Sequence, residues 1–199
     1  MSNNVMAIDI ETKNLSHEIG GWNNTHMFQV STVTTWDGDV AKIYIDDVLT
    51  DQVTKGDKEI LPLSVLKYDL DDFFEKGGIL LGHNIAGFDL PVLKNSMDIY
   101  CIRKYLQQKR YIDTSRILQK QFGERFKLQN LVDNTLGEKK SLDSEMAPVL
   151  WKQGEYDTVI DYCLKDSQLV YDLWKHGQED VIKGFSINKE KIIEMEVKW

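Results

Sequence analysis

The sequence has 199 residues, 42% of them hydrophobic, which is enough for one domain with a sizeable core. No apolar run could span a bilayer and no signal peptide opens the chain, so we expect a cytoplasmic protein without membrane contact. The two cysteines lie far apart and fit neither a disulfide nor a metal pattern. The net charge of −8 excludes a protein that coats nucleic acid indiscriminately.

The basic residues are concentrated in one segment. Residues 103–127 hold eight basic and two acidic side chains, which gives this segment a local net charge of +6. The segment could bind a polyanion weakly. It could equally form the solvated faces of ordinary helices, and composition alone favours that interpretation.

The first part of the chain predicts an antiparallel sheet. Residues 5–12 have the apolar character of a buried strand. Residues 27–36 are rich in β-branched and aromatic side chains, Asp37-Gly38 is a turn signal, and residues 40–45 supply a returning strand. The acidic stretch 46–59 has little periodicity and predicts a loop in which we find no chemistry.

Helices dominate the rest of the chain, so the class is α/β or α+β in a single domain over residues 1–199. A helical pattern precedes the helix-stopping pair Gly77-Gly78, and residues 155–176 carry the longest helical pattern. We also predict strands at 79–81 and 111–114, helices at 88–97, 102–108, 115–122 and 128–136, and a C-terminal β-hairpin within 184–199.

Two carboxylates end the first predicted strand. Asp9 and Glu11 are two residues apart, so both side chains project from the same face. Two like charges at the end of a buried strand repel each other and lose hydration, which a cation between them would relieve. The alternative is a strand that simply runs out into solvent.

The longest helical pattern turns one acid inward. At about 100° per residue, Cys163 lies on the apolar side of this helix, and the other acids lie on the side expected to face solvent. Tyr162 and Asp166 lie on the edge of the apolar sector. An inward carboxylate needs a partner, which could be a nearby Lys or Arg, or a divalent cation shared with Asp9 and Glu11.

A third acid stands in the segment 82–91. Asp89 could cap a helix whose first turn carries Pro91. A capping carboxylate at a strand-to-helix corner can also face a cleft, so the two interpretations do not exclude each other.

Three motifs resemble, in the same order, those of the DEDD superfamily of 3′–5′ exonucleases: D-I-E-T at 9–12, N-x-x-x-F-D at 84–89 and Y-x-x-x-D at 162–166. The tyrosine is typical of the DEDDy branch, which includes the proofreading domains of family B DNA polymerases. Asp161 stands where the histidine branch has its histidine. A weaker similarity lies at Asp113-Thr114. The resemblance implies a ribonuclease H-like fold, a mixed sheet whose first three strands are antiparallel, flanked by helices.

The resemblance further implies an enzyme that hydrolyses phosphodiester bonds at the 3′ end of single-stranded DNA, or less readily RNA, and releases nucleoside monophosphates. Two Mg²⁺ or Mn²⁺ ions would take part, because these hard cations prefer oxygen ligands. Tyr162 would orient the attacking water, since a tyrosine with a pKa near ~10 is a poor base at neutral pH. The implied metal ligands are Asp9, Glu11, Asp89 and Asp166.

Three substrate-binding positions are implied less directly. Leu15, just after the first motif, would wedge between the terminal bases, or it could be a core residue. Phe88 could border the terminal nucleotide or pack in the core. Asn84 could contact the substrate backbone or satisfy a turn. The basic segment 103–127 would follow phosphates, which predicts salt-sensitive binding.

Two other functions stay open. One is a catalytically silent nucleic-acid-binding or assembly module on the same fold, and the other is a structure-specific endonuclease. The presence of all four acids and Tyr162 argues against the silent module, because an idle cluster of acids is electrostatically costly. The expected partners are single-stranded 3′ ends and a polymerase or a repair or replication assembly.

Overall fold

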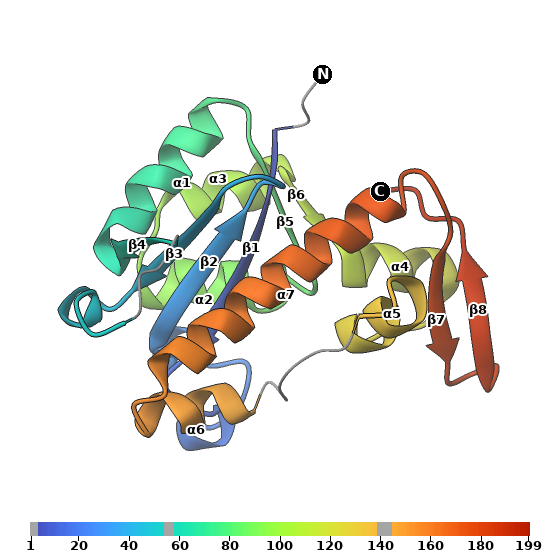
Figure 1. Cartoon of the computed structure of the whole chain (residues 1–199). Helices are drawn as coiled ribbons and strands as arrows, with labels where there is room; N and C mark the ends of the chain where they lie inside the picture. Colours follow the sequence, from blue (N-terminus) through green and yellow to red (C-terminus); the bar gives the residue numbers. More distant parts are fainter. Residues whose placement is uncertain (1–3, 54–57, 139–144) are drawn as a thin grey trace.

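A six-stranded sheet lies at the centre of the computed structural model, which describes residues 4–53, 58–138 and 145–199 (Figure 1). Its strands are β1 (Val5–Thr12), β2 (Val30–Trp36), β3 (Ala41–Ile45), β4 (Glu59–Pro62), β5 (Ile79–Gly82) and β6 (Tyr111–Asp113). They are arranged in the order β4-β3-β2-β1-β5-β6.

The strands nearest the N-terminus are antiparallel, and the later ones are parallel to their neighbours. β1 pairs with β2, and β2 with β3, in antiparallel fashion. β4, β5 and β6 pair in parallel with β3, β1 and β5, respectively. Parallel neighbours require crossover connections, and helices supply most of them here. The structure thereby confirms the predicted mixed α/β sheet with its first three strands antiparallel.

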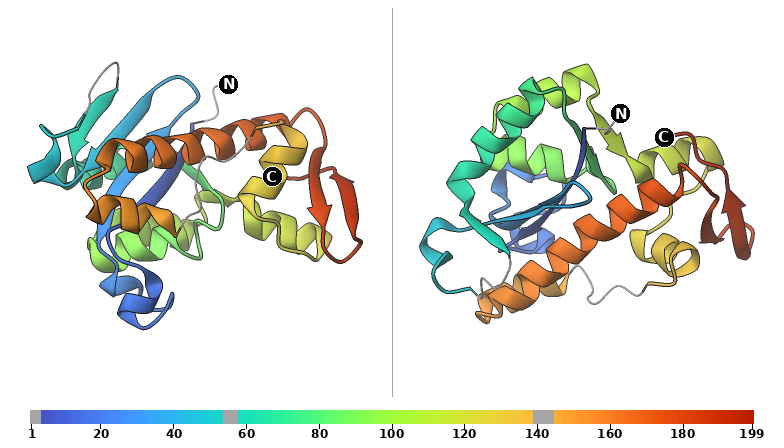
Figure 2. Two further views of the ribbon diagram at one scale, coloured as in Figure 1. Left: turned by 60° about the horizontal axis from the view of Figure 1, so that its bottom comes forward. Right: turned by 45° about the horizontal axis from the view of Figure 1, so that its top comes forward.

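Helices cover both faces of this sheet (Figures 1 and 2). They are α1 (Leu66–Glu75), α2 (Asp89–Ser96), α3 (Cys101–Gln108), α4 (Thr114–Phe122), α5 (Leu128–Thr135), α6 (Met146–Lys152) and α7 (Tyr156–His176). The side chains of β1 alternate between two cores: Ile8 and Ile10 pack with α1, α2 and α3, whereas Val5 and Ala7 pack with α4, α5 and α7. Among the described residues, no helix has both the length and the apolar surface needed to cross a bilayer.

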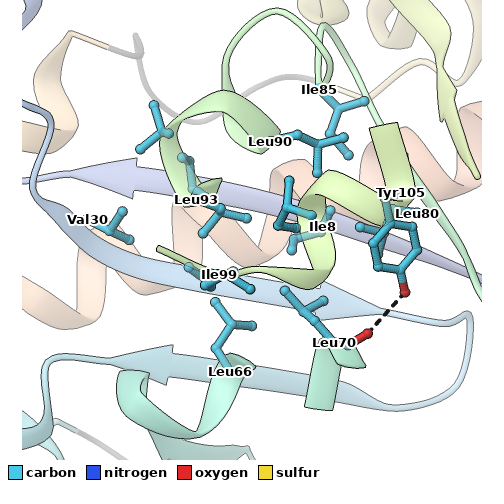
Figure 3. Packing of buried hydrophobic residues seen from close by; sticks show 14 of the residues in the cluster. Ile8, Val30, Leu66, Leu70, Leu80, Ile85, Leu90, Leu93, Ile99 and Tyr105 are labelled. Atoms are coloured by element: carbon cyan, nitrogen blue, oxygen red, sulfur yellow. Dashed lines mark hydrogen bonds between the residues drawn. The ribbon is translucent and has the colours of Figure 1, made fainter. Parts of the chain in front are cut away.

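The core between the sheet and helices α1 to α3 is closely packed (Figure 3). Leu66 and Leu70 of α1 point toward the sheet, where Ile8 lies, and all three side chains are almost completely buried. The hydroxyl of Tyr105, from α3, donates a hydrogen bond of 3.2 Å to the carbonyl oxygen of Leu70. A buried tyrosine therefore satisfies its polar end while it ties α3 to α1.

Two elements are not indicated by the sequence, and one begins later than the pattern predicts. β4 begins at Glu59, the last residue of the stretch expected to be a loop, and its four residues are too few to show an alternating pattern. α6 has only seven residues, which is too short for a helical period to stand out. β2 begins at Val30 because residues 25–27 form a 3₁₀ turn instead of extended chain. Residues 54–57 of the acidic stretch lie outside the described residues.

A β-hairpin follows the long helix, at the opposite end of the molecule from α1 (Figures 1 and 2). It pairs β7 (Ile182–Ser186) with β8 (Lys191–Met195), so the two strands lie within residues 182–195, where the sequence predicted a hairpin within 184–199. One face packs on α5 through Gly184. A Cβ on Gly184 would lie 3.0 Å from Phe126 and 3.1 Å from Leu131, so the absence of a side chain permits this close approach.

Shortening one buried side chain of α1 tests the packing in Figure 3. We expect Leu70→Ala to lower the free energy of unfolding by about 2–5 kcal/mol, because the surrounding helices cannot close the cavity completely. Tyr68→Ala, on the exposed side of the same helix, should change it by less than about 0.5 kcal/mol. Denaturant unfolding followed by circular dichroism measures both, and equal losses for the two variants would contradict the packing described.

Candidate active site

Two carboxylates project from one face of β1. Asp9 and Glu11 alternate with Ile8 and Ile10, which enter the opposite core, so both acids share the face over which α7 packs. Glu11 is only 9% exposed, and Asp9 is half-buried. The strand therefore keeps these acids at the sheet, and the alternative of a strand running out into solvent is wrong.

Hydrogen bonds hold α7 against this part of the sheet. Thr34 of β2 lies opposite Asp9, and its hydroxyl donates to the carbonyl oxygen of Cys163 at 3.0 Å. The same hydroxyl is 3.2 Å from the hydroxyl of Ser167. The thiol of Cys163 lies 3.4 Å from the carbonyl oxygen of Asp9, to which it donates. One turn of α7 is thus fixed over the middle of β1 and β2.

This attachment turns Tyr162 and Asp166 into the space that the acids of β1 face. Both side chains are buried, with 1% and 5% exposure. Burial raises the pKa of Tyr162 far above its usual range, and the negative charges of Asp166, Glu11 and Asp9 and a hydrogen bond with Asp166 raise it further. The hydroxyl therefore keeps its proton at neutral pH and serves as a hydrogen-bond donor.

Asp89 joins the same group of acids from α2. Its side chain is 7% exposed, and burial raises its pKa to about 7. The charges of Asp113 and Asp166 act in the same direction, whereas backbone hydrogen bonds from Asp89 itself and from Ile10 oppose the shift. Phe88, not Asp89, occupies the N-cap position of α2, so Asp89 does not serve as the cap.

These electrostatic effects show which predicted site residues the structure brings together. Asp9, Glu11 and Asp166 lie close enough to Tyr162 to act on its pKa, and Asp166 also acts on Asp89. The predicted inward direction of Asp166 is confirmed by its burial. The four acids come from β1, α2 and α7, and more than 70 residues separate Glu11 from Asp89 and Asp89 from Asp166 in the sequence. The fold brings these elements close enough for the electrostatic effects described.

The loop before α2 is fixed by the buried carboxylate of Asp113, which the sequence indicated only through the weak similarity at Asp113-Thr114. Asp113 is 3% exposed and accepts hydrogen bonds from the backbone amides of Asn84 and Ala86, both at 3.0 Å, and of Arg116 at 3.1 Å. Asn84 has a φ of 66°, and its side-chain oxygen accepts a hydrogen bond of 3.0 Å from Arg125. Asp113 therefore holds the turn that carries Asp89, while it caps α4.

The three predicted substrate-binding residues surround this site in different ways. Asn84 lies in the turn just described, where its backbone amide donates to Asp113 and its side chain accepts from Arg125. Phe88 is half-buried and packs edge-on against Phe28, with ring centroids 5.1 Å apart. Leu15 is half-buried before a 3₁₀ turn and is absent from the apolar core clusters among the described residues, which argues against the core interpretation.

The type of ligand at this site suits a hard divalent cation. All four predicted ligands are carboxylates, and mutual repulsion of buried carboxylates is what a cation would relieve. Within the described residues, however, no three Asp, Glu, His or Cys side chains are gathered into a group that could hold a metal ion. The fit therefore rests on the chemistry of the donors and their electrostatic coupling.

The raised pKa of Asp89 predicts how pH changes stability in EDTA. In the folded chain this carboxyl keeps its proton up to about pH 7, whereas its pKa in the unfolded chain is near 3.8. Its contribution to stability is therefore full below pH 3.8 and lost as the pH rises through about 7. We expect Asp89→Asn to be more stable than the wild type at pH 8, by at least about 1 kcal/mol.

The difference should shrink as the pH falls toward 5, where Asp89 itself is neutral in the folded chain. Thermal unfolding at a series of pH values measures it. Asp161→Asn, which changes an exposed acid on α7, is the matched control for the loss of one carboxylate. A difference for Asp89→Asn that stays constant from pH 5 to pH 8 would contradict the burial described.

Comparison with known proteins agrees with the fold. A search of curated proteins finds no match. A family model described as "RNase_H superfamily" matches residues 6–191, a range that contains all four predicted ligand acids and Tyr162. This match extends over nearly the whole chain and includes every strand of the central sheet. The chain therefore belongs to the RNase H superfamily, whose membership indicates a nuclease-type function.

Proposed function

We propose that this protein is a metal-dependent 3′–5′ exonuclease of the DEDDy type, acting on single-stranded nucleic acid, with DNA preferred over RNA. The observation that carries the proposal is the buried contact of Tyr162 with Asp166, in electrostatic reach of Asp9 and Glu11. A core needs no such group of acids, and burying them is costly unless they serve a ligand.

The four carboxylates Asp9, Glu11, Asp89 and Asp166 would hold two Mg²⁺ or Mn²⁺ ions. When bound, these ions would neutralise the negative charge that develops during hydrolysis, and they would favour ionisation of the attacking water. The chain's own contribution is to fix the carboxylates on rigid elements. β1 presents two of them, and the hydrogen bonds at Thr34 and Asp113 set the positions of α7 and α2.

Tyr162 would orient the attacking water. Its raised pKa keeps the proton on Oη, so the hydroxyl can donate a hydrogen bond but cannot accept a proton at neutral pH. Because Tyr162 also contacts Asp166, its ring has little freedom to turn away. This restraint suits a residue that positions a reactant rather than one that transfers a proton.

Substrate phosphates would be bound by the basic segment 103–127. Two of its arginines lie at the turn that carries Asp89: Arg116 is 3.5 Å from a carboxylate oxygen of Asp113, and Arg125 donates to Asn84. Both are exposed, so either guanidinium can also contact a phosphate. Contacts of this kind predict binding that weakens as the salt concentration rises.

The direction of degradation distinguishes the candidate functions. We expect a 5′-labelled single strand to shorten one nucleotide at a time in Mg²⁺ or Mn²⁺, a 3′-labelled strand to release labelled mononucleotide at once, and EDTA to abolish both. DNA and RNA strands assayed in parallel give the sugar preference. Internal cuts would support a structure-specific endonuclease, and binding without cleavage in either metal would support a silent binding module.

Single substitutions test the site residues. Asp9→Ala should lower the rate at least about 100-fold, because loss of a direct metal ligand should cost no less than loss of an outer-shell partner.

Tyr162→Phe should lower the rate of cleavage by about 10-fold or more while some activity remains. Asp161→Asn, which changes an exposed acid beside Tyr162, is the matched control and should keep the wild-type rate. A wild-type rate for Tyr162→Phe would show that the hydroxyl is not used.

A further inference from the structure

We propose that Trp22 is a stacking platform for the unpaired base at the 3′ end of a bound strand. The proposal rests on the proposed function, because it assumes a nucleic-acid substrate, and it adds a binding residue that none of the three motifs contains. The first observation is exposure. Trp22 is 59% exposed, whereas the other tryptophans of the chain are buried or half-buried.

The ring of Trp22 belongs to an aromatic cluster that includes Phe88, the residue before Asp89. Its centroid lies 5.4 Å from that of Phe88 in an edge-on arrangement and 5.9 Å from that of Phe28. Phe28 is 3% exposed and Phe88 is half-buried, so exposure increases from the core to Trp22. Phe88 is the N-cap residue of α2 and directly precedes Asp89, so the aromatic cluster contacts the start of the helix that carries this predicted metal ligand.

The loop that carries Trp22 is held in place. Asn24 donates from its side chain to the carbonyl oxygen of Ile19 at 2.7 Å, and Asn95 of α2 donates to the hydroxyl of Thr25 at 2.7 Å. On the other side, Glu18 forms an ion pair of 2.5 Å with Lys152 of α6, beside which this loop lies in Figure 1. Trp22 is therefore tied to α2, the helix that begins with Asp89.

The indole of Trp22 is limited by its packing. Gly20 and Gly21, just before it, have φ values of +80° and +116°, a conformation that other residues rarely adopt. The contacts of the indole with the rings of Phe88 and Phe28 limit how far it can rotate. A ring limited in this way loses less conformational entropy when a ligand stacks on it.

The chemistry of the ring indicates what would cover it. Every nucleobase has a flat π face, and stacking on an aromatic side chain contributes to binding of single strands without demanding a particular base. A base stacked on Trp22 must be unpaired, which matches a single-stranded end. The platform thus selects a terminus that carries a base, and the phosphate contacts of the basic segment do not make that distinction.

Binding in EDTA tests the platform without any need for cleavage. The probes are a single-stranded oligodeoxynucleotide and the same strand with an abasic 3′-terminal residue. We expect the normal strand to quench tryptophan fluorescence, since Trp22 is the exposed indole. We also expect the abasic end to raise the Kd of the wild type by about 5- to 150-fold.

Trp22→Ala should raise the Kd for the normal strand by a similar factor, measured by fluorescence anisotropy of a labelled strand, and should make the two probes bind alike. Trp22→Phe should restore most of the discrimination. Tyr68→Ala, which removes an exposed aromatic ring on α1, is the control and should bind as the wild type does.

Equal binding of the two probes by the wild type, or an unchanged Kd for Trp22→Ala, would overturn the platform. The first of these measurements needs no variant, so it decides the question even if Trp22→Ala folds poorly. Failure of the platform is separable from failure of the exonuclease proposal. A wild type that discriminates the probes but never cleaves supports the platform alone, and one that cleaves but does not discriminate supports the exonuclease alone.

Discussion

The attachment of α7 to β1 and β2 is the constraint on which the rest of the site depends. The hydroxyl of Thr34 reaches the carbonyl oxygen of Cys163, and the thiol of Cys163 reaches the carbonyl oxygen of Asp9. These contacts fix both the rotation of the helix and its position along the strands. A slide of α7 by one turn would carry Asp166 about 5.4 Å away from the acids of β1. These two small polar contacts in an apolar interface thus set the position of Asp166 relative to the acids of β1.

The electrostatic state of the site follows from that packing. Burial raises the pKa values of Asp89, Tyr162 and Cys163 together, and for each of them neighbouring carboxylates add to the effect. Of these three groups only Asp89 is ionised in the unfolded chain at neutral pH, so the fold stores unfavourable free energy in that carboxyl, which a bound cation would release. Membership of the RNase H superfamily agrees with this arrangement, since it indicates a nuclease-type function. Stability and ligand binding are consequently linked at the same few residues.

Much of the fold and of the candidate site could be predicted because strong local patterns carried the information. The alternation in β1, the inward direction of Asp166 and the long period of α7 are properties of single elements. β4 and α6 were not predicted, because such short elements have too few residues to show a hydrophobic period. The roles of Asp113 and Trp22 depend on which distant segments they touch, and a sequence pattern does not encode that contact. Contacts between residues that are distant in the sequence are therefore known only from the structure.

The C-terminal hairpin has a consequence for the behaviour of the protein at high concentration. Its outward face pairs Phe185 with Ile192, and both are exposed, while Lys183 forms a cross-strand ion pair of 3.3 Å with Glu194. Side chains of α5 cover the edge of β7, because Asn130 bonds to the backbone of Phe185 and Thr135 to that of Lys183. β8 is the other edge strand of this two-stranded sheet, and strands of separate molecules can join along such an edge. Charged groups must be desolvated before an edge is extended, so Glu194 raises the cost of self-association along β8.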